Sequence, residues 1–425
     1  MAKESLINKI YKRALHVLRN SAKPEGFVAS SAFEHYDSIW IRDACLSLPG
    51  ALASGNRFLI NTSKRTLQTT ADTISERGKV VNSYNPKNQS REWGELGCAD
   101  TNPLFIFAAG EYLKHTGDVR FVKKIYPALE KAYQWITYQD PANYGLFSAI
   151  PANTWQDSTL AQEGYVFNLN VFYYMASVAM IILGDSIGNK LDIDSEQLRR
   201  KINFYFWPER RENLSKEYPT IMYSHLQLRK GEKLVFPHTA SLKDYDHASY
   251  ERNHYASHIK FAHHIDKCDV LSDLLAIIYN IADYEKANRI IDYLQAQKAA
   301  DPYPAKSWVE PETSESKLSM WDKEVENLGF QETQWTNKPK TYHNGGIWPF
   351  IGGVYVTALC KIGKIHQAES ELEALAQANN LGIGFHEWIN PRTKKPGNRA
   401  PANQTWNAAW YVMAYLALRI VKMEN

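Results

Sequence analysis

Aromatic, acidic and amide side chains recur together in five short segments of this chain. The segments are IWIRD (39–43), NTWQDS (153–158), YHNGGIWPF (342–350), GFHEW (384–388) and QTW (404–406). Flat ring faces stack on a pyranose, and glycines let the backbone approach a ligand closely. Carboxylate, amide and imidazole groups bind the hydroxyls of such a ligand. These residue types predict a sugar-binding pocket that contains acidic side chains.

Four carboxylates in these segments and in the stretch CADTNP (98–103) could act on a glycosidic bond. Hydrolysis needs one carboxylic acid to protonate the leaving oxygen, and a second carboxylate as base or nucleophile. Burial beside aromatic rings keeps such an acid protonated near neutral pH. The candidates are Asp43, Asp100, Asp157 and Glu387.

Each of these carboxylates also has a purely structural explanation. Asp157 and Asp100 could each cap the start of a helix. Asp43 could pair with Arg42, and Glu387 could be an ordinary carboxylate of a surface turn. The spacing alone leaves both explanations open.

The neutral candidates are equally ambiguous one by one. The run from His343 to Gly346 could be a tight turn, because Asn-Gly is a strong turn dipeptide. Trp348 and Trp406 could be core residues at helical spacing. What favours a site is that so many of these clusters fall at the starts of predicted helices.

A histidine-rich stretch at 247–268 is the alternative place for chemistry. His254 and His258 are four residues apart, a spacing that could hold zinc on a helix. The stretch is very polar and has no HExxH motif, so solvated or pocket-lining histidines are favoured. We expect no metal ion and no organic cofactor.

The composition argues against several classes of protein. The formal net charge is +3, charged residues make up 22%, and no basic cluster is interleaved with aromatics, so nucleic acid is not an expected partner. No uninterrupted apolar run is long enough to cross a membrane, and the four cysteines lack disulfide or zinc spacing. We expect a soluble, cytoplasmic protein that binds a small-molecule saccharide, with its oligomeric state open.

Helical periodicity extends over the whole chain. Apolar residues recur at i, i+3, i+4 and i+7 in stretches near 3–20, 42–54, 57–78, 102–116, 119–138, 163–184, 194–206, 270–282, 284–298, 349–363, 365–378 and 404–422. Short turns join many of them into hairpins, and the candidate residues fall in the longer connections. The pattern predicts an all-α fold, a ring of helical hairpins with long loops on one face. We expect a single domain over 1–425, with an irregular insertion or lid around 207–268.

Taken together, the motifs resemble glycoside hydrolases with an (α/α)6 barrel. The chain is similar to the amylo-α-1,6-glucosidase type, the C-terminal glucosidase domain of glycogen debranching enzymes, and to the alkaline/neutral invertases of family 100. The resemblance extends from IWIRDA (39–44) through CADTNPLF (98–105) and the central motifs to QTWNAAWYVMAY (404–415), in matching order and spacing. It implies a six-hairpin glycosidase toroid that hydrolyses an O-glycosyl bond.

The resemblance also implies roles for individual residues. An inverting mechanism would use Asp157 as general acid and Glu387 as general base, with the two carboxyl groups about 6.5–9.5 Å apart to admit a water. Asp100 is the chief rival for the role of acid. The residues expected to bind the sugar are Tyr36, Trp40, Arg42, Asp43, Asp100, Trp155, His343, Asn344, Trp348, Trp388, Gln404 and Trp406.

Departures from the family pattern bear on the substrate. No separate transferase domain precedes the motifs, so bifunctional glycogen debranching is not expected. The invertases carry a Cys-Met-Ile-Asp-Arg-Arg run where this chain has NTWQDS, which favours hydrolysis of a short α-linked glucoside over sucrose. Sucrose hydrolysis is the first alternative, and a sugar isomerase or epimerase that uses His263 and His264 is the second. A phosphorylase and a non-catalytic sugar-binding protein are further alternatives.

Overall fold

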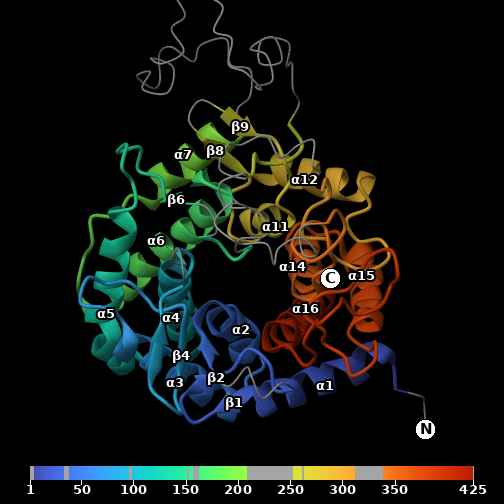
Figure 1. Cartoon of the computed structure of the whole chain (residues 1–425), viewed down its shortest axis with the longest axis horizontal. Helices are drawn as coiled ribbons and strands as arrows, with labels where there is room; N and C mark the ends of the chain where they lie inside the picture. The colour runs from blue at the N-terminus through green and yellow to red at the C-terminus, as the bar shows by residue number, and fades with distance from the viewer. Residues whose placement is uncertain are drawn as a thin grey trace, which may run out of the picture.

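Two concentric rings of helices make up most of the described chain (Figure 1). The computed structural model describes residues 4–32, 38–94, 98–150, 153–156, 162–207, 252–260, 263–311 and 338–424, without the side chains of 260, 263 and 264. Each inner helix packs on the next one, and the last packs on the first. The inner helices are α2 (Ile41–Ala53), α4 (Thr101–Thr116), α6 (Phe167–Ile187), α11 (Val270–Ile278), α14 (Pro349–Lys361) and α16 (Thr405–Glu424).

The outer helices alternate with the inner ones along the chain and cover them from outside (Figure 1). They are α1 (Leu6–Ser21), α3 (Arg57–Thr73), α5 (Val119–Thr137), α7 (Ser195–Phe206), α12 (Tyr284–Ala296) and α15 (Ile365–Ala378). The first of them, α1, packs against α16, so the first and last helices lie side by side.

Burial explains which helices lie inside. Every residue of α14 from Pro349 to Cys360 is buried, and so is every residue of α2 from Ile41 to Leu52. A helix that is apolar on all faces needs neighbours on all faces. On α5, by contrast, the buried residues form one stripe at helical spacing, as expected of a helix with a solvent face. They are Phe121, Val122, Ile125, Tyr126, Leu129, Ala132 and Ile136.

Short antiparallel strands line the connections between the helices. One pair is β1 (Ala22–Lys23) with β2 (Gly26–Phe27). A three-stranded sheet contains β3 (Ile39–Trp40), β4 (Ser83–Asn85) and β5 (Ser90–Glu92). A four-stranded sheet has the order β6 (Ser148–Ala149), β7 (Gly164–Val166), β8 (His258–Lys260) and β9 (His263–Ile265).

The structure confirms the predicted all-α ring and each of the predicted helical stretches. The differences lie at the ends of elements. The stretch predicted from 163 begins as strand β7, so α6 starts at Phe167, and α3 ends at Thr73 where Ile74 becomes extended. The stretch predicted from 102 is α4, which starts one residue earlier, at Thr101. The stretch predicted from 270 is α11, which starts at Val270 with Asp269 at the N-cap position.

Two further expectations concern whole segments. Residues 208–251 of the predicted insertion or lid lie outside the described residues, so that element and the single domain stay predictions. The described helix α6 is long and apolar enough to cross a membrane, which the sequence analysis did not anticipate, and 72% of its apolar window is buried inside the fold. Its position in the inner ring accounts for that composition.

The contact that closes the inner ring generates the first prediction. A Cβ atom on Gly50 of α2 would overlap the carbonyl oxygen of Ala409 on α16. The Cβ atom would be fixed to one helix and the carbonyl oxygen belongs to the backbone of the other, so the overlap can be relieved only by moving a helix. Gly50→Ala should therefore lower the free energy of unfolding by about 3 kcal/mol or more. Urea denaturation measures this loss.

Gly55→Ala is the matched control for this substitution. Gly55 follows α2, has a φ of +65°, and has no neighbouring atom within 4 Å of the place that an alanine methyl group would take. Its substitution should cost only the left-handed backbone strain, about 1 kcal/mol. Equal losses for the two variants would show that helix contact at Gly50 is not the limiting constraint.

Candidate active site

Arg42 and Asp100 connect the starts of two neighbouring inner helices. The Nε atom of Arg42 donates to Asp100 Oδ2 at 2.7 Å, and both side chains are buried. Asp100 stands at the N-cap position of α4, yet its side chain makes no capping hydrogen bond. Its other oxygen, Oδ1, has no partner among the described residues. Asp100 therefore does not act as a helix cap here, and Arg42 holds it with one oxygen available.

An aromatic cluster joins three segments that are far apart in the sequence. His343 stacks on Trp348 with ring centroids 4.5 Å apart and planes 6° from parallel. Trp155 meets both rings edge-on, at 4.8 Å from His343 and 5.4 Å from Trp348. Trp406 stacks on Phe350 at 4.4 Å. The rings thus bring the NTWQ segment, the HNGGIWPF segment and the start of α16 together.

Backbone contacts add the last predicted segment to this cluster. Ile389 and Ile347 form an antiparallel bridge, and the amide of Asn407 donates to the carbonyl of His386 at 2.6 Å. The backbone N–H of Glu387 donates to Pro401 O at 2.8 Å, and its side chain is half-buried. Glu387 therefore lies two residues before Ile389, whose backbone pairs with Ile347, the residue next to Trp348.

Burial controls the charge of His343. Neither of its ring nitrogens has a partner among the described residues, and only 1% of the residue is exposed. Desolvation lowers the pKa of His343 well below its usual value, and the Arg42 charge lowers it further. The imidazole is neutral, so it can offer one donor and one acceptor to a ligand.

Three residues other than glycine adopt positive φ in or beside the predicted motifs. They are Tyr342 at 40°, Phe385 at 50° and Asn403 at 51°. Left-handed backbone costs about 1–3 kcal/mol at such residues and persists only where the surroundings impose it. Two of these residues lie within predicted motifs and Asn403 directly precedes a third, while seven other described residues with positive φ lie outside the five motifs, so this strain is not confined to them.

Many buried polar atoms at this end of the ring lack hydrogen-bond partners in the described part of the chain. Buried polar groups are nearly always paired, with protein, water or ligand. These atoms are Asp100 Oδ1, both ring nitrogens of His343, the amide atoms of Gln156, Gln162 and Gln404, and Nε1 of Trp40, Trp155 and Trp406. Their number indicates a site that a polar ligand completes.

The remaining predicted site residues lie in different environments. Asp43 is buried in the first turn of α2, and Asn344 is buried in the turn after His343. Trp388 is buried against Gly397 and 6.0 Å from the Tyr342 ring, which is a packing environment. Tyr36 and Asp157 lie outside the described residues.

The predicted motifs do not include Lys79, whose partly buried amino group lies close to Asp100. Its Nζ atom donates to Cys98 O at 2.5 Å and to Thr101 Oγ1 at 3.1 Å, and lies 4.8 Å from the centroid of the Trp135 ring. Burial lowers the pKa of Lys79, while Cys98 and Asp100 oppose that shift. Lys79 thereby fixes the turn that presents Asp100. No local pattern around it signals this contact.

Asp269, at the N-cap position of α11, lies outside the predicted motifs and is chemically unusual. Burial raises its pKa to about 6, and Oδ1 has no partner among the described residues. The backbone of Asp269 forms an antiparallel bridge with Trp308. The hydroxyl group of Ser307, the residue before Trp308, donates to His343 O at 2.6 Å. Asp269 therefore belongs to the same end of the ring, on the inner helix α11.

The neutrality of His343 predicts a pH dependence of stability. Its folded pKa lies below the unfolded value of about 6.5, so the unfolded chain binds more protons in acid and stability falls as the pH drops below 6.5. His258, with a pKa lowered to about 4, acts in the same direction. In His343→Gln, the slope between pH 6.5 and 5 should decrease by up to ~1.4 kcal/mol per pH unit.

Denaturant titrations at several pH values measure that slope. His366→Gln is the control, because the His366 side chain is fully exposed on α15. An unchanged slope in His343→Gln would mean that His343 is charged in the folded protein.

Comparisons with known proteins agree with this architecture. The chain is 22% identical to a probable alkaline/neutral invertase F of Arabidopsis thaliana, over 93% of this chain and 84% of that protein. It is 20% identical to cytosolic invertase 1 of Oryza sativa subsp. japonica, over 93% of this chain and 75% of that one. Both similarities extend over nearly the whole chain.

Solved structures share the fold. A GH63 mannosylglycerate hydrolase from Thermus thermophilus superposes with a TM-score of 0.61 at 13% identity, covering 95% of this chain and 99% of that one. A rhamnosidase from Klebsiella oxytoca superposes with a TM-score of 0.59 at 12% identity, covering 98% and 65%. At these identities the likeness concerns the fold.

The family model of amylo-alpha-1,6-glucosidase matches residues 12–184 and 275–395, which together are more than half of the chain. These residues contain the Arg42–Asp100 pair, most of the aromatic cluster and Glu387. The match confirms the resemblance seen in the sequence. The chain is a glycoside hydrolase and belongs to the amylo-alpha-1,6-glucosidase family.

Proposed function

We propose that this enzyme hydrolyses a short α-linked glucoside with inversion of the anomeric carbon. Asp157 protonates the leaving oxygen, and Glu387 takes a proton from the attacking water. The enzyme needs no organic cofactor for this reaction and works in the cytosol, the location that one relative's name records.

The set of unpartnered buried polar atoms is the observation that carries the proposal. A pyranose presents hydroxyl groups on its edges and C–H groups on its faces. The amide atoms of Gln404 and Gln156 and the nitrogens of His343 can bind hydroxyls, while Trp155 and Trp406 offer ring faces and N–H donors. A sugar satisfies both requirements at once.

The contacts around the two proposed catalytic residues support their pairing. Trp155, which precedes Asp157 by two residues, packs on Trp348. Ile347, next to Trp348, pairs with Ile389, which follows Glu387 by two residues. Trp348 therefore contacts the first segment directly and adjoins the residue that pairs with the second.

The Arg42–Asp100 pair has a different role in this proposal. Asp100 Oδ1 is available to accept hydrogen bonds from hydroxyls, and the bond from Arg42 Nε orients the carboxylate through Oδ2. A carboxylate held by an arginine in this way is suited to binding sugar hydroxyls. We therefore assign the role of acid to Asp157 and not to Asp100.

Sucrose is the second candidate substrate, because relatives that match over nearly the whole chain are named as invertases. A panel of isomaltose, maltose, short α-1,6-branched oligosaccharides and sucrose separates the candidates. We expect glucose release from an α-glucoside, with the β-anomer appearing first by NMR. Fructose release as the fastest reaction would establish the invertase alternative, and first appearance of the α-anomer would contradict inversion.

Amide variants test the proposed acid and base. Asp157→Asn and Glu387→Gln should each lower kcat by roughly 10²–10⁴-fold, because each removes one proton transfer. Glu373→Gln is the control, since Glu373 is exposed on α15. Steady-state kinetics, with thermal unfolding to verify folding, gives the answer. Turnover near that of the wild type in either variant would remove that residue from the mechanism.

A further inference from the structure

A second group of chemically active side chains lies at the β8–β9 hairpin. His254 precedes β8, Cys268 follows β9, and Asp273 stands in the first turn of α11. Each offers one ligand atom, and these atoms lie within 4.8 Å of one another. Cys268 and Asp273 are fully buried, and His254 is 9% exposed. All three fall in the stretch 185–274 that the family model does not match, so the group lies outside the part of the chain that defines the family.

The hydrogen bonds leave one ligand atom of each side chain facing the group. The Nδ1 atom of His254 lies 2.9 Å from the carbonyl oxygen of Tyr255, so this nitrogen carries the proton and Nε2 keeps its lone pair. Asp273 Oδ1 accepts the N–H of Tyr255 at 3.0 Å, and Cys268 Sγ lies 3.4 Å from Asp273 Oδ2. Backbone contacts that orient ligands in this way are typical of metal sites.

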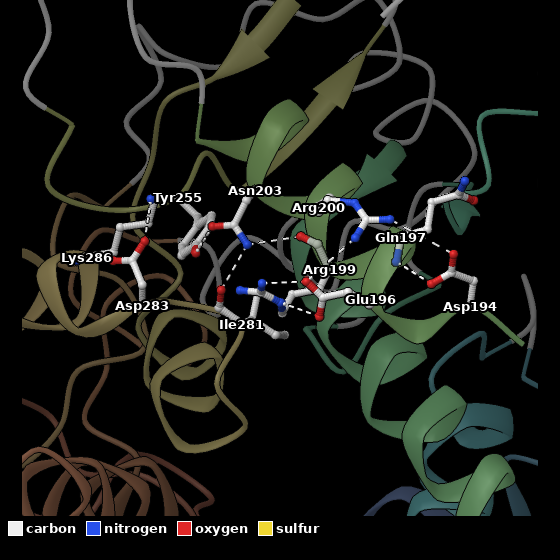
Figure 2. A network of polar contacts seen from close by, with 10 residues as sticks. All are labelled: Asp194, Glu196, Gln197, Arg199, Arg200, Asn203, Tyr255, Ile281, Asp283 and Lys286. Atoms are coloured by element: carbon white, nitrogen blue, oxygen red, sulfur yellow. Dashed lines mark hydrogen bonds and ion pairs between the residues drawn. The ribbon is translucent and has the colours of Figure 1, made fainter. Parts of the chain in front are cut away.

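The scaffold of the group is anchored on neighbouring helices. The Tyr255 hydroxyl donates to Asn203 Oδ1 at 2.8 Å, and the Asn203 amide donates to Ile281 O at 2.9 Å, so the loop is tied to α7 and to the connection before α12 (Figure 2). The Tyr255 ring also stacks on Phe167 at 4.5 Å. The ligand atoms are thus positioned by contacts that need no metal ion.

The charge around the group favours a cation. The carboxyl groups that interact electrostatically with Cys268 are those of Asp273, Asp269 and Glu310. Asp266 Oδ1 lies 3.9 Å from His254 Nε2, and it also accepts from Arg252 at 2.7 Å. A divalent ion at the centre of the group would be bound by a thiolate and a carboxylate whose charges offset its own.

We propose that His254 Nε2, Cys268 Sγ and Asp273 Oδ2 bind one divalent transition-metal ion of the zinc type. A nitrogen, sulfur and oxygen donor set suits zinc, and Asp266 is the nearest candidate for the fourth position. Binding forms the three metal–ligand bonds, breaks the S–H bond of Cys268 and releases that proton to solvent. The ion joins both ends of the β8–β9 hairpin to α11 and stabilises that corner of the ring.

Cobalt substitution of the untagged full-length enzyme tests the site. Metal analysis of the purified protein should find about one zinc per chain, and removal of the ion with a chelator should lower Tm. Co²⁺ added to the stripped protein should give a thiolate-to-cobalt charge-transfer band and the intense d–d bands of a tetrahedral site. A wild-type protein that shows neither the bands nor a metal-dependent Tm overturns the proposal, whatever the variants do.

Variants then assign the ligands. Cys268→Ser should abolish the charge-transfer band and weaken Co²⁺ binding at least tenfold, and His254→Gln should weaken binding while the thiolate band stays detectable at high Co²⁺. Cys360→Ser is the matched control, because Cys360 is buried on α14 and belongs to no such group in the described residues. Unchanged Co²⁺ affinity and spectrum in Cys268→Ser would overturn the assignment. The readouts are independent of glycosidase activity.

Discussion

The close approach of α2 to α16 is the contact on which the ring depends. It joins the first inner helix to the last, and Gly50 faces the backbone of Ala409 where any side chain would prevent it. Without that contact the inner helices would form an open arc, and the segments that start them would not converge. The contact is also among the most distant in the sequence, so the entropy of closing the chain has to be offset by the burial around it.

The N-termini of the inner helices differ from those of the outer helices. Outer helices such as α1, α3 and α5 are capped at their N-termini by the side chains of Ser5, Asn56 and Asp118. The inner helices α2, α4, α6 and α14 have no capping side chain. A missing cap typically costs about 1 kcal/mol. At three of these four starts the N-cap position carries a predicted site residue, namely Trp40, Asp100 or Trp348, and Asp100, which could cap, binds Arg42.

The helices could be predicted from the sequence, but the contacts between the motifs could not. Periodicity depends on residues three and four apart, so each helix could be predicted, while the entry to α6 could not, because β7 pairs with a distant strand. The motifs likewise revealed which residue types form the site. Arg42 pairs with Asp100, which is 58 residues away, and Lys79 donates to Thr101, 22 residues away. Such pairings depend on tertiary distance, which no local pattern contains.

Desolvation at the starts of the inner helices acts on every ionisable group in the same direction, towards the neutral form. It lowers the pKa of His343 and of Lys79, and it raises the pKa of Asp269 to about 6. Arg42 would oppose this effect on nearby acids, but Asp100 compensates its charge at 2.7 Å.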